Sequence, residues 1–437
     1  MELKPSLNDL PSELINQIFS HLDYNDLKNC KYLNKRFYAL AKDENHWREL
    51  CKLYWLETSC PLGRTWEEHF AYWYSDMGLY IDCYANLKRT WEKIVTFFKI
   101  NCPQIYQTIK SGVSEEDLDV VEEGLGLNQK LPIDMRCSYR IHNGQRLTSP
   151  GIMGSMSIPG HYKSESLLDL DTILVGFRER EGLKGCIPLT LCLHSGLTQY
   201  LAVTDEDGYE PNTIFYPVQS ESAHNRRSMD AFISGTSFQD WLSTHADHLA
   251  NEDYVIIQDQ PFRFLHDPAA EETTGYITVS VATCFLPEVS KINPPKFFHT
   301  YRITLLHMLM TAVYAASLGF SMTMSPDAPQ SESCQLETRH WIITDDNGSE
   351  EQVDGPGVVG EYPVMYPGAS FSWVSSTSFS TTYGNMKGCF RMRNLQTSER
   401  SEVQCPIFHM KCQPYITGEE REAAKKRKRE QMKNSAT

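Results

Sequence analysis

The sequence lacks the short motifs that indicate most metal sites and many hydrolases and nucleotide-binding enzymes. Its 437 residues include 13 cysteines, but no two of them form a C-x-x-C pair, so a zinc ribbon or RING-type site is not expected. An odd number of scattered cysteines favours a reduced intracellular compartment over a disulfide framework. G-x-S-x-G, H-E-x-x-H and Walker A motifs are also missing. We therefore expect no catalytic residues, no metal ligands and no cofactor.

The chain also lacks an excess of positive charge and an apolar N-terminal signal. Lys and Arg number 41 against 56 Asp and Glu, and the net charge of −15 argues against a general nucleic-acid binder. The N-terminal MELKPSLNDLPSEL has no secretory core, so Asn347-Gly348-Ser349 is interpreted as a turn and not as a glycosylation site. Hydrophobic residues (41%) and charged residues (22%) have ordinary globular shares. The length favours roughly two to four domains.

The first block, residues 1–55, has the pattern of short amphipathic helices in quick succession. Pro11 can stand at the start of the first helix, where no backbone amide needs a partner. Asp23 or Asn25, Asn34 and Asn45 can cap the next three helices. The first helix carries an apolar stripe at helical spacing: Leu14, Ile15, Ile18, Phe19 and Leu22. Such a small unit either packs on a neighbouring domain or exposes an apolar face to a partner.

Two further blocks precede the C-terminal part of the chain. Residues 56–86 form an aromatic-rich helical linker, which we expect to serve packing. Residues 87–250 mix helices and strands, which predicts an α+β domain. Within it, Ser114 to Asp117 form a capping box. The segments 187–193 and 199–203 are strand-like.

The fourth block, residues 254–417, is rich in strands and predicts an all-β antiparallel sandwich. Alternating or β-rich segments are separated by Gly, Pro, Asn and Asp at short intervals: 276–285, 297–304, 339–344, 358–364 and 370–376. A charged tail over 418–437 is expected to be disordered or a frayed helix.

The first block resembles an F-box in both order and spacing of residues. The matching elements are these: Leu10-Pro11-x-Glu13-Leu14, Ile18-Phe19-x-x-Leu22-Asp23, Asp26-Leu27-x-x-Cys30, Lys35-Arg36-Phe37 and Trp47-Arg48. The third block is similar to the SUKH family, with Trp91, the capped helix from Ser114 to Gly124, Leu131-Pro132-x-Asp134 and Asn143-Gly144. The fourth block resembles the ApaG family, which has a fibronectin-III-like sandwich fold. Its marks are Gly355-Pro-Gly357-Val-Val-Gly360-Glu-Tyr-Pro363, Pro367-Gly368, Phe371 and Gly384-Asn-Met386-x-Gly388.

One apolar run departs from the ApaG pattern. Residues 305–324 contain no formally charged side chain, and the length alone would suit a membrane span. Strand-like sequence with ApaG character lies on both sides of the run. Because a span would separate strands of one sandwich, we interpret the run as an insertion in a loop or an error in the gene model, and we expect no membrane interaction.

The F-box resemblance implies that the first block binds the Skp adaptor and, through it, the cullin and RING subunits of a ubiquitin ligase. The chain would then be a non-catalytic receptor that brings substrate proteins to ubiquitination and proteasomal degradation, with the SUKH-like and ApaG-like blocks choosing the substrate. The expected adaptor contacts are apolar: Leu10, Pro11, Leu14, Ile18, Leu22 and Leu27. The alternative is that this stripe packs inside the chain, but the compact unit and the motif spacing favour a partner.

A second hypothesis concerns the glycine loop of the ApaG-like block. Gly355, Gly357 and Gly360 spell G-x-G-x-x-G, but Pro363 would interrupt the helix that a dinucleotide site needs. The loop could still bind a small anion or nucleotide through its amides, or it could simply be a tight turn. The basic run 425–429 is either a nuclear import signal or a solubilising end, so both cytoplasm and nucleus are expected locations.

Overall fold

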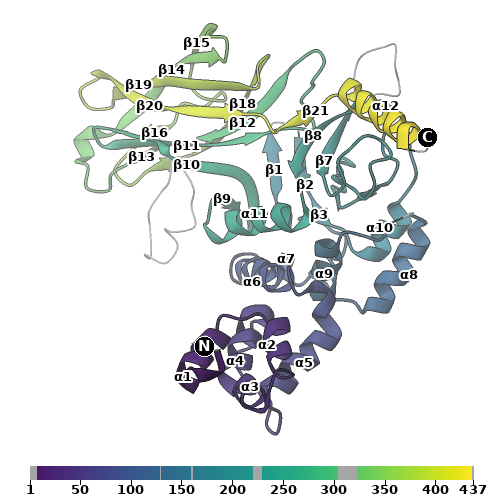
Figure 1. The fold of residues 1–437 in the computed structure, drawn as a ribbon. Helices are drawn as coiled ribbons and strands as arrows, with labels where there is room; N and C mark the ends of the chain where they lie inside the picture. Colours follow the sequence, from purple (N-terminus) through teal and green to yellow (C-terminus); the bar gives the residue numbers. More distant parts are fainter. Residues whose placement is uncertain (1–6, 128, 159–160, 220–228, 304–321, 436–437) are drawn as a thin grey trace, which may run out of the picture. The chain divides into compact units, whose positions relative to one another are not determined.

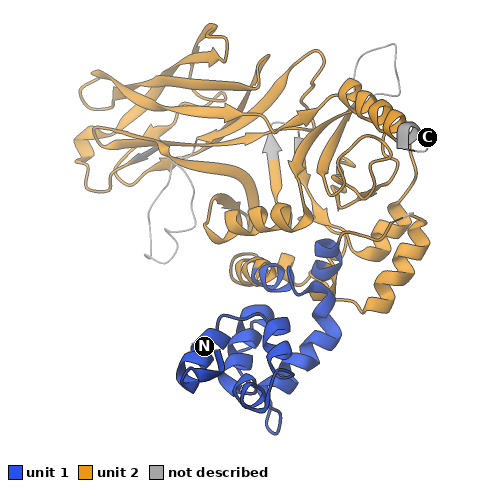
Figure 2. Ribbon diagram, in the orientation of Figure 1, with its two compact units in different colours: residues 1–89, 133–138 blue, residues 90–132, 139–437 orange. Residues whose placement is uncertain are grey.

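The chain divides into two compact units. The computed structural model describes residues 7–127, 129–158, 161–219, 229–303 and 322–435. The first unit comprises Met1–Arg89 and Ile133–Ser138, and the second comprises Thr90–Pro132 and Tyr139–Thr437 (Figure 2). Each unit is described by itself below.

Short helices build the first unit. Their bounds are η1 (Leu7–Asp9), α1 (Ser12–Phe19), α2 (Tyr24–Cys30), α3 (Lys35–Ala41), α4 (Glu44–Leu50), the π-helix η2 (Cys51–Trp55), α5 (Trp66–Met77) and η3 (Gly78–Tyr80). The unit also holds the first residues of α6 (Tyr84–Asn101) and of α9 (Ile133–Ile141). The predicted all-α character of the N-terminal block is confirmed.

Side-chain caps start the helices α2, α3 and α4. The Asp23 carboxylate accepts the Asp26 amide of α2 at 2.8 Å, and the Asn34 side chain accepts the Phe37 amide of α3 at 2.9 Å, as the sequence predicts. The prediction that Asn45 caps the fourth helix is wrong. Asp43 is the capping residue, and its carboxylate accepts the Asn45 amide at 2.9 Å. Both residues are good caps, and local sequence does not decide between candidates two positions apart.

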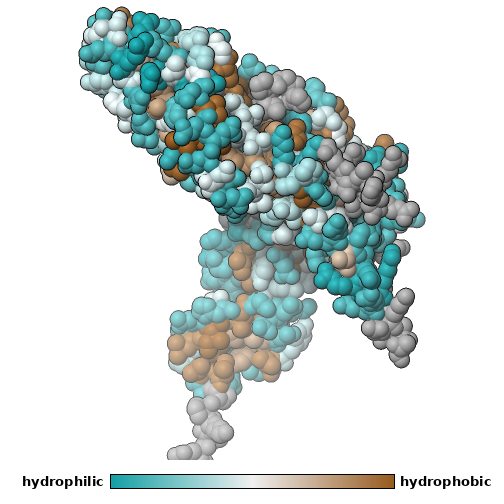
Figure 3. All heavy atoms as spheres, turned by 90° about the horizontal axis from the view of Figure 1, so that it is seen from above, coloured by the Kyte–Doolittle hydropathy of each residue, from teal (hydrophilic) through white to brown (hydrophobic). Residues whose placement is uncertain are grey.

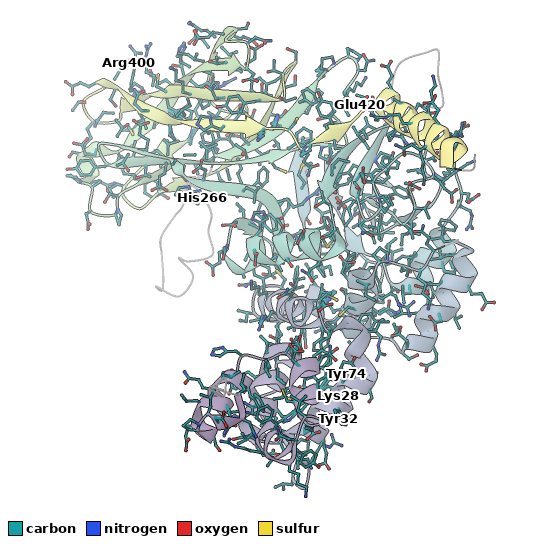
Figure 4. All side chains as sticks on the ribbon, viewed as in Figure 1. Lys28, Tyr32, Tyr74, His266, Arg400 and Glu420 are labelled. Carbon is teal, nitrogen blue, oxygen red and sulfur yellow. The ribbon has the colours of Figure 1, made fainter. Side chains whose placement is uncertain are left out.

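Aromatic rings pack the centre of the first unit. Phe19 of α1 meets Phe37 of α3 edge to face at 5.5 Å, and Trp47 of α4 meets Phe70 of α5 at 5.4 Å. Tyr74 of α5, labelled in Figure 4, lies 5.1 Å from the ring of Tyr24 in α2. The aromatic residues of the predicted linker thus pack on the preceding helices, which makes that segment part of the same core.

The N-terminal part of the second unit mixes helices and strands. Its helices are α7 (Pro103–Tyr106), α8 (Glu115–Leu125), α10 (Leu170–Gly176) and α11 (Phe238–Ala250). The predicted capping box is confirmed, because Ser114 and Asp117 exchange side-chain and backbone hydrogen bonds at the start of α8. One antiparallel sheet has the strand order β21 (Tyr415–Ile416), β8 (Met229–Gly235), β7 (Ile214–Gln219), β6 (Tyr200–Ala202) and β4 (Cys186–Pro188). The short strands β3 (Ser166–Leu167) and β5 (Thr190–Leu191) form a separate pair.

Two sheets form the predicted C-terminal sandwich (Figure 1). The first contains β9 (Tyr254–Ile257), β10 (Gln260–Thr274), β11 (Ile277–Phe285), β12 (Phe297–Ile303), β13 (Met322–Met324), β17 (Ser370–Phe371) and β18 (Trp373–Phe379). The second contains β14 (Cys334–Asp345), β15 (Glu350–Pro356), β16 (Val364–Met365), β19 (Tyr383–Asn394) and β20 (Arg400–Lys411). Tyr301 of β12 meets Trp341 of β14 across the core at 6.3 Å, which ties the two layers together.

Strand pairing joins the sandwich to the mixed part of the second unit. β1 (Ser155–Ile158) pairs in parallel with β10 and antiparallel with β2 (His161–Ser164), so strands of the third block extend a sheet of the sandwich. In the other direction, β21 follows the sandwich in the chain but pairs with β8. The third and fourth sequence blocks therefore share hydrogen-bonded sheets within one compact unit.

The structure corrects one predicted strand of the sandwich and describes part of the predicted insertion. The predicted strand over 358–364 is wrong, because Val358 and Glu361 exchange backbone hydrogen bonds of 2.9 and 2.8 Å and close a tight turn. Most of the predicted insertion at 305–324 lies outside the described residues, and its last three residues form β13. Among the helices that are described, none is long and apolar enough to cross a membrane.

The C-terminal tail differs from the expectation of disorder or a frayed helix. Residues Gly418–Ser435 form the helix α12 (Figure 1). Arg421 is 1% exposed, lies 4.3 Å from the ring of Tyr209 and donates to the Asp207 carbonyl at 2.9 Å. A long-range contact of this kind fixes a helix whose own sequence has little amphipathic pattern.

Candidate partner-binding surface

One side of α1 is apolar and faces away from the core of its own unit. Ile15 and Phe19 are buried, whereas Leu14 is 46% and Ile18 39% exposed. Because residues four apart share a helix face, Leu14 and Ile18 form a row along the exposed side. Leu7, just before the helix, is 51% exposed. We call Leu7, Leu10, Pro11, Leu14 and Ile18 the α1 surface. Apolar spheres gather in the helical unit in Figure 3.

Arg36 of α3 fixes the segment that leads into α1. Its guanidinium donates to the Asn8 carbonyl at 2.5 Å, to the Leu10 carbonyl at 2.7 Å and to the Ser12 hydroxyl at 3.1 Å. Three acceptors on one planar group leave the segment little freedom. Leu10 is half-buried and Pro11 is exposed, so this segment extends the apolar face of the helix.

A hollow of ≈ 530 Å³ lies next to the end of α1 in the same unit. Leu22 and Leu53 line it, and Leu53 is 58% exposed. Three carboxylates also line the hollow: Asp23, Asp43 and Glu49. Burial lowers the pKa of His46 in its wall, so this ring is neutral at physiological pH. The hollow therefore combines apolar side chains with negative charge.

The structure brings five of the six expected adaptor contacts into one accessible region. Leu10, Pro11, Leu14 and Ile18 belong to the α1 surface, and Leu22 lines the neighbouring hollow. Leu27 has a core position instead: its side chain is fully buried beneath the hollow. Leu27 lies on the inner face of the short helix α2. A motif match alone does not tell whether a residue faces inward or outward.

Two exposed side chains of this region were not expected from the sequence. Leu7 precedes Leu14 by one heptad, and that spacing could have indicated a shared face. Leu53 belongs to the π-helix η2, whose wider turn changes the direction of its side chains. Leu33 is also exposed, at 65%, whereas Phe37 is buried.

The glycine loop of the sandwich forms a tight turn. Gly357 and Gly360 have φ of 55° and 87°, and Gly355 is the penultimate residue of β15. A Cβ on Gly357 would lie 2.4 Å from the Glu361 carbonyl, so the close backbone approach requires glycine. The Gly357 amide donates to the Glu337 carbonyl at 2.9 Å, and the Val358 and Glu361 amides pair with each other's carbonyls. These amides already donate hydrogen bonds within the protein, so fewer of them are left to bind an anion.

The next described element after β15 is the strand β16 and not a helix, so the glycine loop lacks the arrangement of a dinucleotide site. Arg339 donates to the Pro356 and Gly357 carbonyls at 3.0 and 2.7 Å, which fixes the loop further. In the described part of the chain, no group of three or more His, Cys, Asp and Glu side chains is placed to hold a metal ion.

Comparisons with known proteins match two separate parts of the chain. The family model named F-box-like matches residues 7–53, and the model of the ApaG domain matches residues 287–394. F-box only protein 3 of Bos taurus is 43% identical over 411 residues, which cover 93% of this chain and 84% of that protein. The chain belongs to the F-box only protein 3 family.

More distant relatives in plants and bacteria share parts of this F-box only protein 3 architecture. F-box protein SKIP16 of Arabidopsis thaliana is 24% identical over 431 residues, covering 88% of this chain and 92% of that protein. Protein ApaG of Methylocella silvestris is 35% identical over 138 residues, covering 31% of this chain and 88% of that protein. The F-box-like match contains the whole α1 surface.

Proposed function

We propose that this chain is the substrate-recognition subunit of a Skp-cullin-F-box ubiquitin ligase. The observation that carries the proposal is the row of exposed apolar residues on α1, whose opposite face is buried in the helical core. A helix that carries apolar side chains on two faces can bury one face in its own unit and leave the other for a partner. The family to which the chain belongs and the F-box-like match over residues 7–53 support this partner as a Skp-type adaptor.

The chemistry of the surface defines the partner's side of the interface. Leu14 and Ile18 are apolar anchors, and complete burial of such a side chain stabilises a complex by roughly 1.5–3 kcal/mol. Since Asp23, Asp43 and Glu49 line the adjacent hollow, basic side chains of the adaptor would complement it. The anchors would supply affinity, and the charges would set orientation.

The second unit would recruit the substrate proteins. A receptor of this kind catalyses nothing itself: it raises the effective concentration of the substrate near the ubiquitin-conjugating enzyme that the cullin and RING subunits supply. Proteasomal degradation would follow. Candidate contact loops in the sandwich are Asp345 to Gly348 and Asp354 to Gly360, because loops on a rigid scaffold commonly carry recognition.

We also propose a SUKH-like fold for residues 87–250, beside an F-box at 1–55 and an ApaG-like sandwich at 254–417. Its support is the mixed content of helices and strands and the capped helix α8 at the predicted position. Cytoplasm and nucleus are the proposed locations. The proposed nuclear location rests on the basic run 425–429. This run lies on α12, where Lys425 pairs with Asp207 at 3.1 Å.

Co-purification of the full chain with a Skp adaptor tests the proposal. We expect the wild-type chain to form a stoichiometric complex. Leu14→Asp combined with Ile18→Asp should weaken the affinity at least about 100-fold, because two anchors are lost and two carboxylates enter an apolar interface. Both side chains are well exposed, so the thermal unfolding temperature should change little.

Leu79→Asp is the matched control. Leu79 is 63% exposed in the same unit but lies in η3, outside residues 7–53. It should co-purify like the wild type. A folded wild-type chain that binds no adaptor, or a double variant that binds as tightly as the wild type, would refute the proposed role of the α1 surface.

A further inference from the structure

A second cleft, of ≈ 420 Å³, lies within the second unit where the mixed part meets the sandwich. Side chains far apart in the sequence line it: Trp241 and Thr244 of α11, Arg263 of β10, Phe285 of β11, His299 of β12 and Lys411 of β20. Its size lies within the range of small-ligand pockets. The α1 surface and the glycine loop contribute nothing to it.

A buried ionic network holds the position of Arg263 in the wall of this cleft. Glu165 is fully buried, and its carboxylate lies 3.1 Å from the Arg263 Nη1. The same carboxylate accepts the hydroxyl of Tyr216 at 2.7 Å, the hydroxyl of Thr190 at 2.8 Å and the amide of Gln199 at 2.9 Å. Arg263 also donates to the Tyr216 hydroxyl at 3.0 Å. A group fixed from several sides is preorganised to bind a ligand.

Polar groups of the cleft lack partners in the protein. Among the described residues, the Arg263 Nε, the His299 Nε2 and the Gln413 Oε1 are buried without a hydrogen-bond partner. His299 is 1% exposed. The two nitrogens can donate a hydrogen bond, whereas the Gln413 Oε1 can only accept one. A buried donor without a partner costs free energy in the folded state, so the two donors in one cleft indicate a ligand that supplies acceptors.

The charged side chains around the cleft restrict the charge of the ligand that it can bind. None of the described residues that line it is Asp or Glu. Glu165 offsets the charge of Arg263, and burial lowers the pKa of both His245 and His299 to about 4, which leaves these rings neutral. Exposed Lys411 is then the remaining Lys or Arg in the lining, which also contains His248 and His409. A group with a single negative charge matches this balance, whereas a phosphate dianion would be left partly uncompensated.

We propose that this cleft binds a carboxylate of a substrate peptide. One carboxylate oxygen would accept the Arg263 Nε–H, and the other would accept His299 with its proton on Nε2. Lys411 would compensate the charge, and Trp241 and Phe285 would contact the apolar part of the peptide. The proposal deepens the receptor function and rests on it for the choice of a peptide as ligand.

Fluorescence polarisation with four labelled hexapeptide pools tests the proposal on the full chain. Three pools are amidated: one without acidic residues, one ending in Glu and one ending in phosphoserine. The fourth has the neutral composition and a free C-terminal carboxylate. We expect the free-acid pool, the Glu pool or both to bind at least about tenfold tighter than the neutral amide. Their ratio identifies a terminal or a side-chain carboxylate.

Three results would overturn the carboxylate assignment: equal binding of the neutral amide, tighter binding of the phosphoserine pool, or no binding of any pool at about 1 mM. Thr244→Trp, which fills the cleft from an exposed position on α11, should abolish binding, and Lys411→Glu should weaken it at least about tenfold. Lys387→Glu on β19 is the matched control, since this exposed lysine does not line the cleft.

Equal binding by Lys411→Glu and Lys387→Glu would also overturn the proposal. The peptide assay contains no adaptor, and both lysine variants should still co-purify with the adaptor like the wild type. Failure of the cleft proposal is therefore distinguishable from failure of the proposed ligase function.

Discussion

Single residues decide how the helices of the first unit begin. Asp43 caps α4 through the Asn45 amide, and the Asn45 side chain itself donates to Asp43 at 3.0 Å. We expect Asp43→Ala to cost about 1 kcal/mol of the free energy of unfolding, the usual contribution of a cap. Asn45→Ala should cost less than half of that. Urea unfolding of both variants measures the difference, and a larger loss for Asn45→Ala would contradict the assignment.

Local patterns allowed prediction of many individual positions. The caps at Asp23 and Asn34 depend on the residue itself and on its neighbours within one turn, so the sequence indicates them directly. The burial of Leu27 and the exposure of Leu33 depend on which neighbouring helix covers each face. Helical spacing alone does not distinguish an inner from an outer apolar position.

At the level of elements, α12 shows how a contact far away in the sequence stabilises a polar helix. The Arg421 guanidinium lies buried against Tyr209 and donates to the Asp207 and Met229 carbonyls. The start of the helix is held by the Asp230 carboxylate, which accepts the Gly418 amide at 2.8 Å. The composition of the tail suggested disorder because its partners lie about 200 positions earlier in the chain.

Removing the buried arginine should release this helix. We expect Arg421→Met to raise the rate of tryptic cleavage within residues 425–429 at least about tenfold, because proteolysis requires local unfolding. Arg427→Met removes a comparable charge from an exposed position of the same helix and should leave the rate near that of the wild type. Equal rates for the two variants would show that Arg421 does not hold α12.

The strands of the sandwich also show what can and cannot be predicted from local sequence. The alternation over 276–285 predicted β11 within one residue at its start, because one face of that strand lies in the core. The segment 358–364 has β-branched residues too, yet Val359 adopts a φ of 45° in the turn. The pattern of residue types did not reveal the reciprocal hydrogen bonds that close this turn.

For the whole molecule, buried histidines couple stability to pH. Burial lowers the pKa of His299 from 6.5 to about 4. Between these values the unfolded chain binds a proton that the folded chain does not, so stability rises with pH across the window and falls on acidification. We expect a loss of roughly 2 kcal/mol from His299 between pH 7 and pH 4.5.

Urea unfolding at both pH values, with amide exchange in β11 and β12 as the local signal, measures this loss. His299→Phe should lose less stability on acidification than the wild type, since its ring does not titrate. His409→Phe, on the exposed side of β20, should keep the wild-type dependence. A His299→Phe variant that is as acid-sensitive as the wild type would assign the effect to other groups.

The sequence blocks and the compact units of the molecule do not coincide. Blocks at 87–250 and 254–417 could be read from composition and resemblance, but β1 pairs with β10 and β21 with β8, which joins them. The carboxylate cleft arises where the two blocks meet, because Trp241 comes from α11 of the block at 87–250, whereas Arg263 and Lys411 come from strands of the block at 254–417. Pairing between distant strands, and any site built on it, is not encoded in a local pattern.

Hydrogen–deuterium exchange of the full chain, with and without a saturating Skp adaptor, tests the central claim most directly. The account predicts slower exchange over Leu7 to Leu22, where the α1 surface and the edge of its hollow lie. Residues of the sandwich should exchange as in the free chain. Unchanged exchange over Leu7 to Leu22 with bound adaptor, or protection confined to the second unit, would contradict the account.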